Sequence, residues 1–531
     1  MELWARRKRG SGLRTKLPEL SNDRSASDTD GRAGAAAKLA SRALALVLLV
    51  SILFTFQPAG GQQTAQTPDN SATQKRPDTG ASEQANKSQH ETKISPQEAQ
   101  DLLQSVDEIL KFASKDSALP IKKNVKRRLT TREEVVAYLR EHMSEDEDAQ
   151  RLRRSELVLK KFGLLPRNFD LQTFLVALLR EQVAGYYDPK TKTVNLLDWL
   201  DSEAQRPVLA HELTHALQDQ SFNLEKWLKS GKDLALEKKN PTSEDINKDE
   251  VQTVRQAIVE GQAMAVLLDY MLAPTGQTIA SEPRLVEAMK EGMLVGTADS
   301  PEFHNAPPFL KEVMTFPYRY GVDFVGQVLV KQGKEKAFSG MFKNPPTSTR
   351  QIMEPQTYLS GERIDPMPLP DFSRLAKDYN KFDVGSMGEF DVAVLIEQYA
   401  GGDVARKLYP QWRGGYYYAA YPKGDPNTSL DLIYVSRWAS AESAAKFAAV
   451  YASQVKERYR KVRPVSTSED SNSSAKPDSL SGSHTWLTED GDVIVAVQGD
   501  TVFVSESFDD ATADRLRSAV MPNVKSAGGG R

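Results

Sequence analysis

Two histidines four residues apart flank a glutamate in the stretch His211-Glu212-Leu213-Thr214-His215. On a helix this spacing is about one turn, so both imidazoles project from the same face. Two such nitrogens fill two corners of a tetrahedral zinc site, and Glu212 can point to an open fourth position. Zinc lowers the pKa of a bound water toward neutrality. A carboxylate beside that water can take its proton and pass it to a leaving amine. The spacing predicts a hydrolytic zinc centre. The alternatives are two ordinary buried histidines and a zinc site without activity.

The third ligand must be His, Asp or Glu, because the chain has no cysteine. The metzincin pattern would need glycine at 218 and histidine at 221, where this chain has Gln218 and Ser221. Asp219 is a possible ligand. Because it lies on the same helix just beyond His215, we expect it instead to accept a hydrogen bond from a zinc-binding histidine.

Glu260 is the favoured third ligand. It stands alone among mostly small and apolar residues on a predicted helix, and a lone carboxylate there needs a partner. A metal would be that partner, while Gly261 and Ala263 would permit close helix packing. The alternatives are a helix-surface glutamate and an ion pair with Arg255. We therefore expect His211, His215 and Glu260 to bind Zn²⁺.

A hydroxyl or a protonated histidine near the metal would stabilise the oxyanion. Tyr320, in the stretch Pro317-Tyr318-Arg319-Tyr320-Gly321, is the first candidate, ahead of Tyr318 and His304. Tyrosines beside glycine are also common packing residues.

The elements that must position these residues follow from local pattern. Pro207 fits the first turn of a helix that runs to about Gln220, and another helix is expected from about Glu250 to Leu272. The Asp188-Pro189 turn predicts a hairpin over residues 184–197, which could offer its edge to an extended peptide or be purely structural. Further helices are expected at 171–182, 281–294 and 322–332.

The N-terminus predicts export. Basic residues precede an uncharged, mainly apolar run at 43–56, and small residues at 59–61 suit signal peptidase. We expect a signal peptide or an uncleaved anchor over 1–61, with 43–56 as a possible membrane tether. Residues 62–95 are too polar to fold and predict a disordered linker. The expected location is extracytoplasmic, either secreted or periplasmic.

Order is expected from Pro96, where apolar residues recur at helical spacing. The first folded unit spans 96–364, and alternating prolines predict a linker at 365–382. Strands at 416–421 and 430–435, a helix at 441–455 and a hairpin of 493–497 with 502–504 predict an α+β module over 383–525.

The chain has 69 Lys+Arg against 72 Asp+Glu, so no net field favours nucleic acid.

Four blocks resemble a group of little-characterised bacterial exported proteins with a neutral zinc metallopeptidase-like, gluzincin-type core. They are 183–189 (VAGYYDP), 211–220 (HELTHALQDQ), 259–263 (VEGQA) and 345–352 (PPTSTRQI), with fainter likeness at 388–390 and 414–416. The resemblance implies zinc ligation by His211, His215 and Glu260, with Glu212 as catalytic acid/base. In that group the last core block usually runs into a histidine-proline pair, where this chain has Met353-Glu354-Pro355.

The sequence thus predicts an α+β protein with a mainly helical, zincin-like metallopeptidase core and a smaller C-terminal α+β module. The first functional hypothesis is an exported zinc metallopeptidase (a hydrolase) acting on a peptide or protein substrate, with Glu212 and Tyr320 catalytic. The second is a non-catalytic envelope protein whose zincin-like scaffold binds a partner through the C-terminal module. Substrate specificity and oligomeric state do not follow from the sequence.

Overall fold

The computed structural model describes residues 93–135, 137, 146–182, 185–228, 235, 238–282, 287, 300–424, 428–465 and 478–521. The predicted signal peptide or anchor, the apolar run at 43–56 and nearly all of the linker at 62–95 lie outside these residues. The same holds for most of the helix predicted at 281–294. Across the described ranges, no helix is both long enough and apolar enough to span a membrane.

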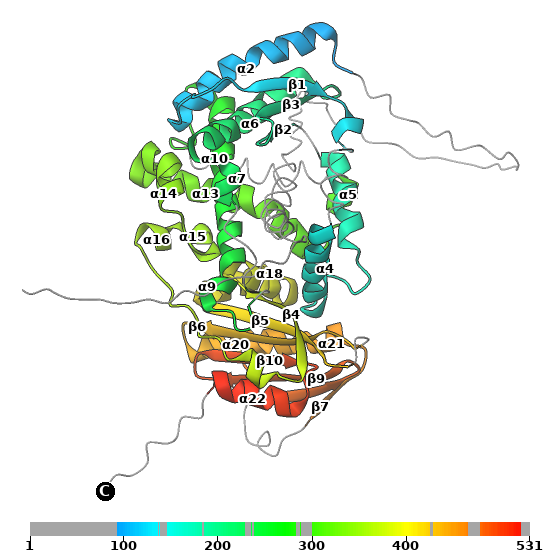
Figure 1. The fold of residues 1–531 in the computed structure, drawn as a ribbon. Helices are drawn as coiled ribbons and strands as arrows, with labels where there is room; N and C mark the ends of the chain where they lie inside the picture. Colours follow the sequence, from blue (N-terminus) through cyan, green and yellow to red (C-terminus); the bar gives the residue numbers. More distant parts are fainter. Residues whose placement is uncertain are drawn as a thin grey trace, which may run out of the picture.

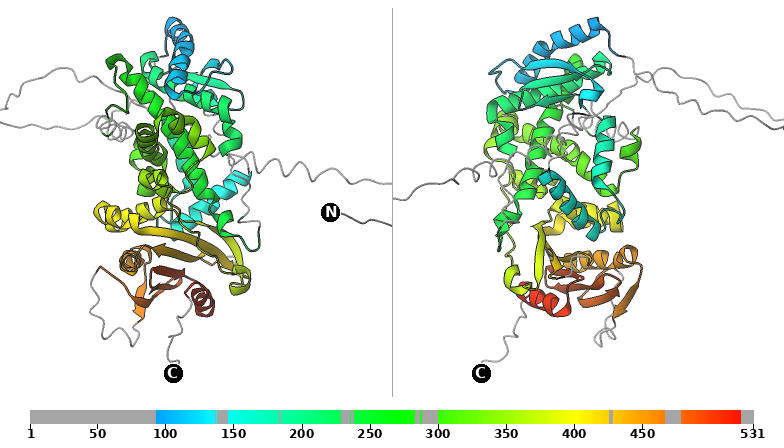
Figure 2. Two further views of the ribbon diagram at one scale, coloured as in Figure 1. Left: turned by 90° about the vertical axis from the view of Figure 1, so that its left-hand side faces the viewer. Right: turned by 45° about the vertical axis from the view of Figure 1, so that its right-hand side comes forward.

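A helical region is stacked on one face of an antiparallel sheet module, so the fold is α+β as predicted (Figure 1). One hydrophobic core runs from the helical region into the sheet, joining residues such as Leu213 and Val325 to Leu432 and Val495. Two further views show the helical layer above the sheet (Figure 2).

The helical region contains most of the helices and a small sheet. Its helices are α2 (Pro96–Ser117), α4 (Asp146–Lys161), α5 (Leu171–Gln182), α6 (Ser202–Phe222), α7 (Leu224–Leu228), α9 (Ser243–Ile246), α10 (Lys248–Leu272), α12 (Pro301–His304), α13 (Pro308–Glu335), α14 (Met341–Lys343), α15 (Thr349–Met353) and α16 (Pro355–Leu359), with a 3-10 turn η1 (Ala273–Thr275) and a π-helical turn η2 (Lys336–Gly340).

Helix α6 carries both histidines and begins earlier than the sequence predicts. Asp201 caps it, because its Oδ1 accepts hydrogen bonds from the backbone N–H groups of Glu203 and Ala204 at 3.0 Å. Pro207 therefore lies inside the helix rather than in its first turn, which corrects the predicted start. From Leu209 to Asp219 every residue of α6 is buried, as a helix between other elements requires.

Helix α10 carries Glu260 and crosses α13 at a pair of glycines. A Cβ on Gly261 would lie 2.4 Å from the carbonyl carbon and oxygen of Gly321, and a Cβ on Gly321 would lie 2.3 Å from the carbonyl oxygen of Ala257. Neither distance is possible for a real side chain, so both positions need glycine. The close approach predicted at Gly261 is confirmed, and its partner is α13.

The predicted hairpin is present as β2 (Tyr186–Asp188) paired antiparallel with β3 (Thr193–Leu197). Asp188 closes its turn by accepting hydrogen bonds from the Lys190 N–H at 2.8 Å and the Thr191 hydroxyl at 2.7 Å. A third strand, β1 (Lys126–Thr130), pairs parallel with β3 and was not predicted. Strand β2 is thus an edge of this sheet, and it lies against α6.

The C-terminal module is a seven-stranded antiparallel sheet in the order β4-β5-β6-β10-β9-β8-β7. Its strands are β4 (Tyr379–Ser386), β5 (Trp412–Pro422), β6 (Asp431–Trp438), β7 (Val462–Val465), β8 (Gly482–Thr488), β9 (Gly491–Gln498) and β10 (Thr501–Glu506). Its helical segments are α17 (Phe372–Leu375), α18 (Glu389–Ala400), α19 (Gly402–Leu408), η3 (Tyr409–Gln411), α20 (Ala441–Ser453), α21 (Val455–Arg458) and α22 (Asp510–Val520).

Side chains alternate between the two faces of this sheet. On β6, Leu432 and Tyr434 face the core shared with the helical region, while Ile433 and Val435 face a second core beneath α22. The strands predicted around 416–421 and 430–435, the helix near 441–455 and the terminal hairpin are confirmed. Strand β4 begins at Tyr379, inside the stretch predicted as linker.

Polar contacts join the two regions where the block at 345–352 meets the residues at 388–390. The Glu250 carboxylate accepts hydrogen bonds from the backbone N–H and the hydroxyl of Thr349 at 2.7 and 2.8 Å. Arg350 pairs with Glu389 at 2.7 Å and with Glu354 at 2.9 Å. These blocks therefore hold the sheet module against α10.

Candidate metal centre

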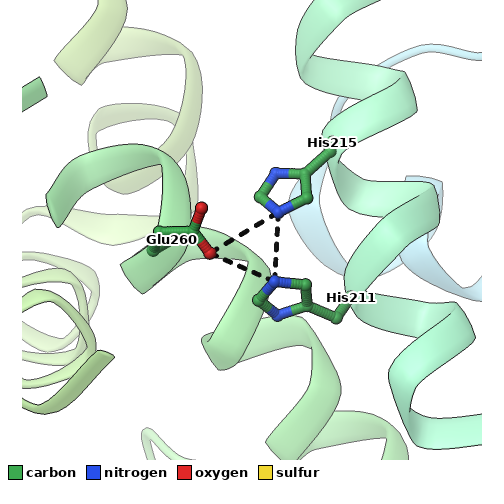
Figure 3. Close-up of side chains that lie close together, drawn as sticks. All are labelled: His211, His215 and Glu260. Carbon is green, nitrogen blue, oxygen red and sulfur yellow. Dashed lines mark hydrogen bonds and ion pairs between the residues drawn. The ribbon is translucent and has the colours of Figure 1, made fainter. Parts of the chain in front are cut away.

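The two histidines of α6 and Glu260 of α10 converge on one point (Figure 3). The Nε2 atoms of His211 and His215 are 3.0 Å apart. The Oε2 atom of Glu260 lies 3.2 Å from Nε2 of His211 and 3.6 Å from Nε2 of His215. The structure therefore brings together all three residues predicted as metal ligands.

These spacings fit zinc. Ligand atoms held tetrahedrally at roughly 2.0–2.2 Å from one ion lie about 3.3–3.6 Å from one another. The observed separations of 3.0, 3.2 and 3.6 Å lie within about 0.3 Å of this range, so a small spreading of the two imidazoles would admit a zinc ion. Two neutral imidazoles and one carboxylate are also a donor set that zinc accepts, with one coordination position left for water or substrate.

Glu260 has no conventional partner in its buried position. Its side chain is 0% exposed, and neither carboxylate oxygen accepts a hydrogen bond from the residues that the structure describes, although Oε2 lies at ion-pair distance from both histidines. Burial alone would raise the pKa of Glu260, but the neighbouring His215 and His211 outweigh it and hold that pKa below its usual value. A carboxylate placed in this way is suited to binding a cation.

Arg255 does not supply the missing partner. Its Nη1 donates to the backbone oxygen of Trp227, and its guanidinium lies 5.1 Å from the centre of the Trp227 ring. The alternative in which Glu260 lies on the helix surface also fails, since its side chain is fully buried.

Glu212 is fixed by the edge strand of the hairpin. Its Oε2 accepts a hydrogen bond from the backbone N–H of Tyr187 at 2.7 Å, while its Oε1 has no hydrogen-bond partner within the described ranges. Burial raises the pKa of Glu212, although the adjacent histidines oppose that shift. One oxygen is thus held in place and the other is available. The hairpin contributes by orienting Glu212, and its use as an edge for a peptide stays a prediction.

Tyr318, rather than Tyr320, lies beside the histidines. The rings of Tyr318 and His211 are 6.4 Å apart between centroids, and Tyr318 is buried one helical turn before Gly321. Tyr320 lies two residues further along α13 and therefore points in nearly the opposite direction, where it packs on Phe316. His304 is exposed at the end of α12. A catalytic tyrosine remains a prediction, and the geometry favours Tyr318 for it.

Asp219 does not contact the histidines, contrary to expectation. Its carboxylate accepts hydrogen bonds from the Tyr187 hydroxyl at 2.8 Å, the Lys192 ammonium at 2.6 Å and the Leu224 N–H at 3.1 Å. It therefore ties the hairpin to α6. Gln218 takes the expected place, with its Oε1 2.9 Å from Nδ1 of His215. Gln218 lies three residues after His215 and Asp219 lies four residues after it. Both spacings place a side chain on the same helix face as His215, so the sequence alone does not distinguish the two residues.

A cavity of about 570 Å³ opens where the two regions meet, away from the histidines. Its lining includes Lys248, Glu250, Arg350, Glu362, Trp412 and Tyr416, and none of the three expected ligands takes part in it. The ligands are instead 0–3% exposed.

Comparison with protein-family models, with curated proteins and with solved structures gave no match.

Proposed function

We propose that this chain is a zinc-dependent metallopeptidase with a zincin-like core. The observation that carries the proposal is the triangle of His211, His215 and Glu260, whose separations fit one zinc ion. Glu212 lies next to His211 on α6, and its Oε1 accepts no hydrogen bond from a described residue. A purely structural zinc site would have no use for a free carboxylate oxygen beside an open coordination position.

Zinc bound by these three residues would supply Lewis-acid chemistry, activating water and polarising a peptide carbonyl. The chain's own contribution is mainly orientation. The Tyr187 N–H holds Oε2 of Glu212, so Oε1 is the atom that can take a proton from the attacking water and deliver it to the leaving amine. Asp219 holds the hairpin that presents this N–H.

The substrate class proposed is a peptide or protein, and the proposed location is extracytoplasmic because of the basic and apolar N-terminus. The apolar run at 43–56 would tether an uncleaved form to the membrane.

A second candidate is a non-catalytic envelope protein whose C-terminal module binds a partner. The deep burial of the ligands favours it, since His211, Glu212, His215 and Glu260 are at most 3% exposed. A peptide would have to reach a site that the folded chain covers.

A Glu212→Gln variant separates the two candidates. Full-length wild type and variant would be incubated with casein and with a mixed peptide library, cleavage would be followed by mass spectrometry, and zinc would be measured on the same samples. The peptidase is expected to keep its zinc and lose at least about 100-fold in rate, because the proton acceptor is gone. Glu203→Gln, an exposed site on the same helix, is the control and should match wild type.

Zinc-loaded wild type that cleaves nothing in either mixture would support the non-catalytic candidate. Equal cleavage by wild type and Glu212→Gln would show that Glu212 has no catalytic role.

A further inference from the structure

A chain of buried amides leads from His215 to the main chain of η2. The Gln218 Nε2 lies 2.9 Å from Oε1 of Gln262 and 3.1 Å from the backbone oxygen of Val259. The Gln262 Nε2 in turn lies 2.8 Å from the backbone oxygen of Ala337 and 3.0 Å from that of Phe338. Gln218 and Gln262 are both 0% exposed, so water does not satisfy these groups.

The two backbone carbonyls set the orientation of Gln262. A carbonyl oxygen can only accept a hydrogen bond, so the group facing Ala337 and Phe338 must be the amide nitrogen. The reverse orientation would place three oxygens together without a hydrogen between them. Oε1 of Gln262 therefore faces α6, where it accepts from Gln218.

Gln218 is oriented by the same reasoning. Its amide nitrogen faces two acceptors, Oε1 of Gln262 and the oxygen of Val259, so its own Oε1 must face Nδ1 of His215. That contact can be a hydrogen bond only if Nδ1 carries the hydrogen. In a neutral imidazole with Nδ1–H, the lone pair is on Nε2, the atom that points to His211 and Glu260.

We propose that Gln218 and Gln262 act as positioning residues that hold His215 in the tautomer with a free Nε2 lone pair and so raise the affinity of the site for zinc. This inference rests on the proposed function, because it takes the triangle of ligands to be a zinc site. We call the hydrogen-bonded side chains of Gln218 and Gln262 the amide relay. It ends on the backbone of η2, and π-helical turns occur frequently at functional sites.

The relay fixes more than the protonation of one ring. It joins α6, α10 and η2 through hydrogen bonds that end on backbone oxygens, so the ring plane of His215 is held before a metal arrives. Partners of this kind on metal-binding histidines typically contribute about 10- to 100-fold in metal affinity. For His211 the described residues offer no such support, since none of them hydrogen-bonds to its Nδ1.

The test compares zinc dissociation constants, measured by competition with a chromophoric chelator, for full-length wild type and variants. Gln218→Ala is expected to weaken zinc binding about 10- to 100-fold, because Nδ1 loses its acceptor. Gln262→Leu touches neither histidine but frees the Gln218 amide to turn over, so a smaller loss, on the order of threefold to tenfold, is expected.

Gln205→Ala is the matched control. Gln205 is a buried glutamine of the same helix, with its Nε2 bound to the backbone oxygens of Leu197 and Leu200. Its loss should lower the melting temperature of the metal-free protein while leaving the zinc dissociation constant within about twofold of wild type. A merely structural role for Gln218 would give this same result in Gln218→Ala.

Unchanged zinc affinity in folded Gln218→Ala or Gln262→Leu protein, beside lost binding in Glu260→Ala, would overturn the relay and leave the zinc site standing. If Gln218→Ala fails to fold, Gln262→Leu decides the question. A wild type that binds no zinc would overturn both proposals.

Discussion

Two glutamates, Glu260 in the helical region and Glu506 in the sheet module, are both 0% exposed but have opposite surroundings. Glu506 receives two hydrogen bonds from the Arg458 guanidinium, at 2.6 and 3.1 Å, and one each from the Tyr451 and Tyr459 hydroxyls. No residue in the described part of the chain donates a hydrogen bond to Glu260, and the Nε2 atoms of His211 and His215 lie 3.2 and 3.6 Å from its Oε2. The Glu506 carboxylate is thus hydrogen-bonded by its own chain, whereas Glu260 has only ion-pair contacts among the described residues.

The number of hydrogen-bond donors around each carboxylate indicates a structural role for Glu506 and a ligand role for Glu260. Breaking a completed buried ion pair leaves the remaining charge stranded, so Glu506 belongs to the stability of the fold. Neither oxygen of Glu260 receives a hydrogen bond from a described residue, and a buried carboxylate in that position costs free energy unless a cation compensates. Burial alone does not distinguish the two roles, whereas counting the donors around each oxygen does.

The largest stability effect is expected at Glu506. Glu506→Gln leaves Arg458 buried without its carboxylate and should lower the free energy of unfolding by about 3–5 kcal/mol in urea denaturation followed by circular dichroism. Glu442→Gln, in the exposed pair with Lys446, should cost below about 1 kcal/mol. Zinc content should stay at the wild-type level in both. A Glu506→Gln protein as stable as wild type would contradict the structural role.

A smaller, pH-dependent effect is expected at Glu250, between the two regions. Burial raises the pKa of Glu250 from 4.5 to about 7, against the opposing hydrogen bonds from Thr349. Because the folded protein favours the protonated form, this contribution to stability is complete below the unfolded pKa and is lost as pH rises through about 7. Wild type should therefore lose up to about 3 kcal/mol between pH 5 and pH 8 at this group.

Glu250→Gln removes that dependence, since its amide stays neutral and its oxygen can still accept from Thr349. Relative to wild type, the variant should gain stability at pH 8 and change little at pH 5, as measured by urea denaturation at both pH values. An equal difference between the two proteins at pH 5 and pH 8 would show that Glu250 does not titrate in this range.

Much of the fold could be predicted where the pattern is local. The hairpin follows from the turn at Asp188-Pro189, and β5 and β6 follow from their aromatic and β-branched runs. Strand β1 could not be predicted, because Lys126–Thr130 is mostly polar and becomes a strand only by pairing with β3, more than sixty residues later. The early start of α6 depends on Asp201, a cap whose effect outweighs the signal from Pro207.

In the site, too, the residues with a local pattern could be predicted, and those that depend on distant contacts could not. His211, Glu212 and His215 follow from spacing on one helix, and Glu260 follows from its isolation among small residues. The choice between Tyr318 and Tyr320 needs the rotation of α13 about its axis, which the crossing of Gly261 and Gly321 sets. Gln218 was missed because its role depends on Gln262 and on backbone oxygens of η2, both far away in sequence.

The most direct test of the zinc site is elemental analysis of the purified full-length protein, comparing wild type, Glu260→Ala and Glu506→Gln at equal folded concentration. We predict about one zinc per chain in wild type and in Glu506→Gln, and almost none in Glu260→Ala, because only Glu260 completes the donor set. Folded wild type without zinc, or Glu260→Ala with the full complement, would contradict the assignment of His211, His215 and Glu260 as a zinc centre.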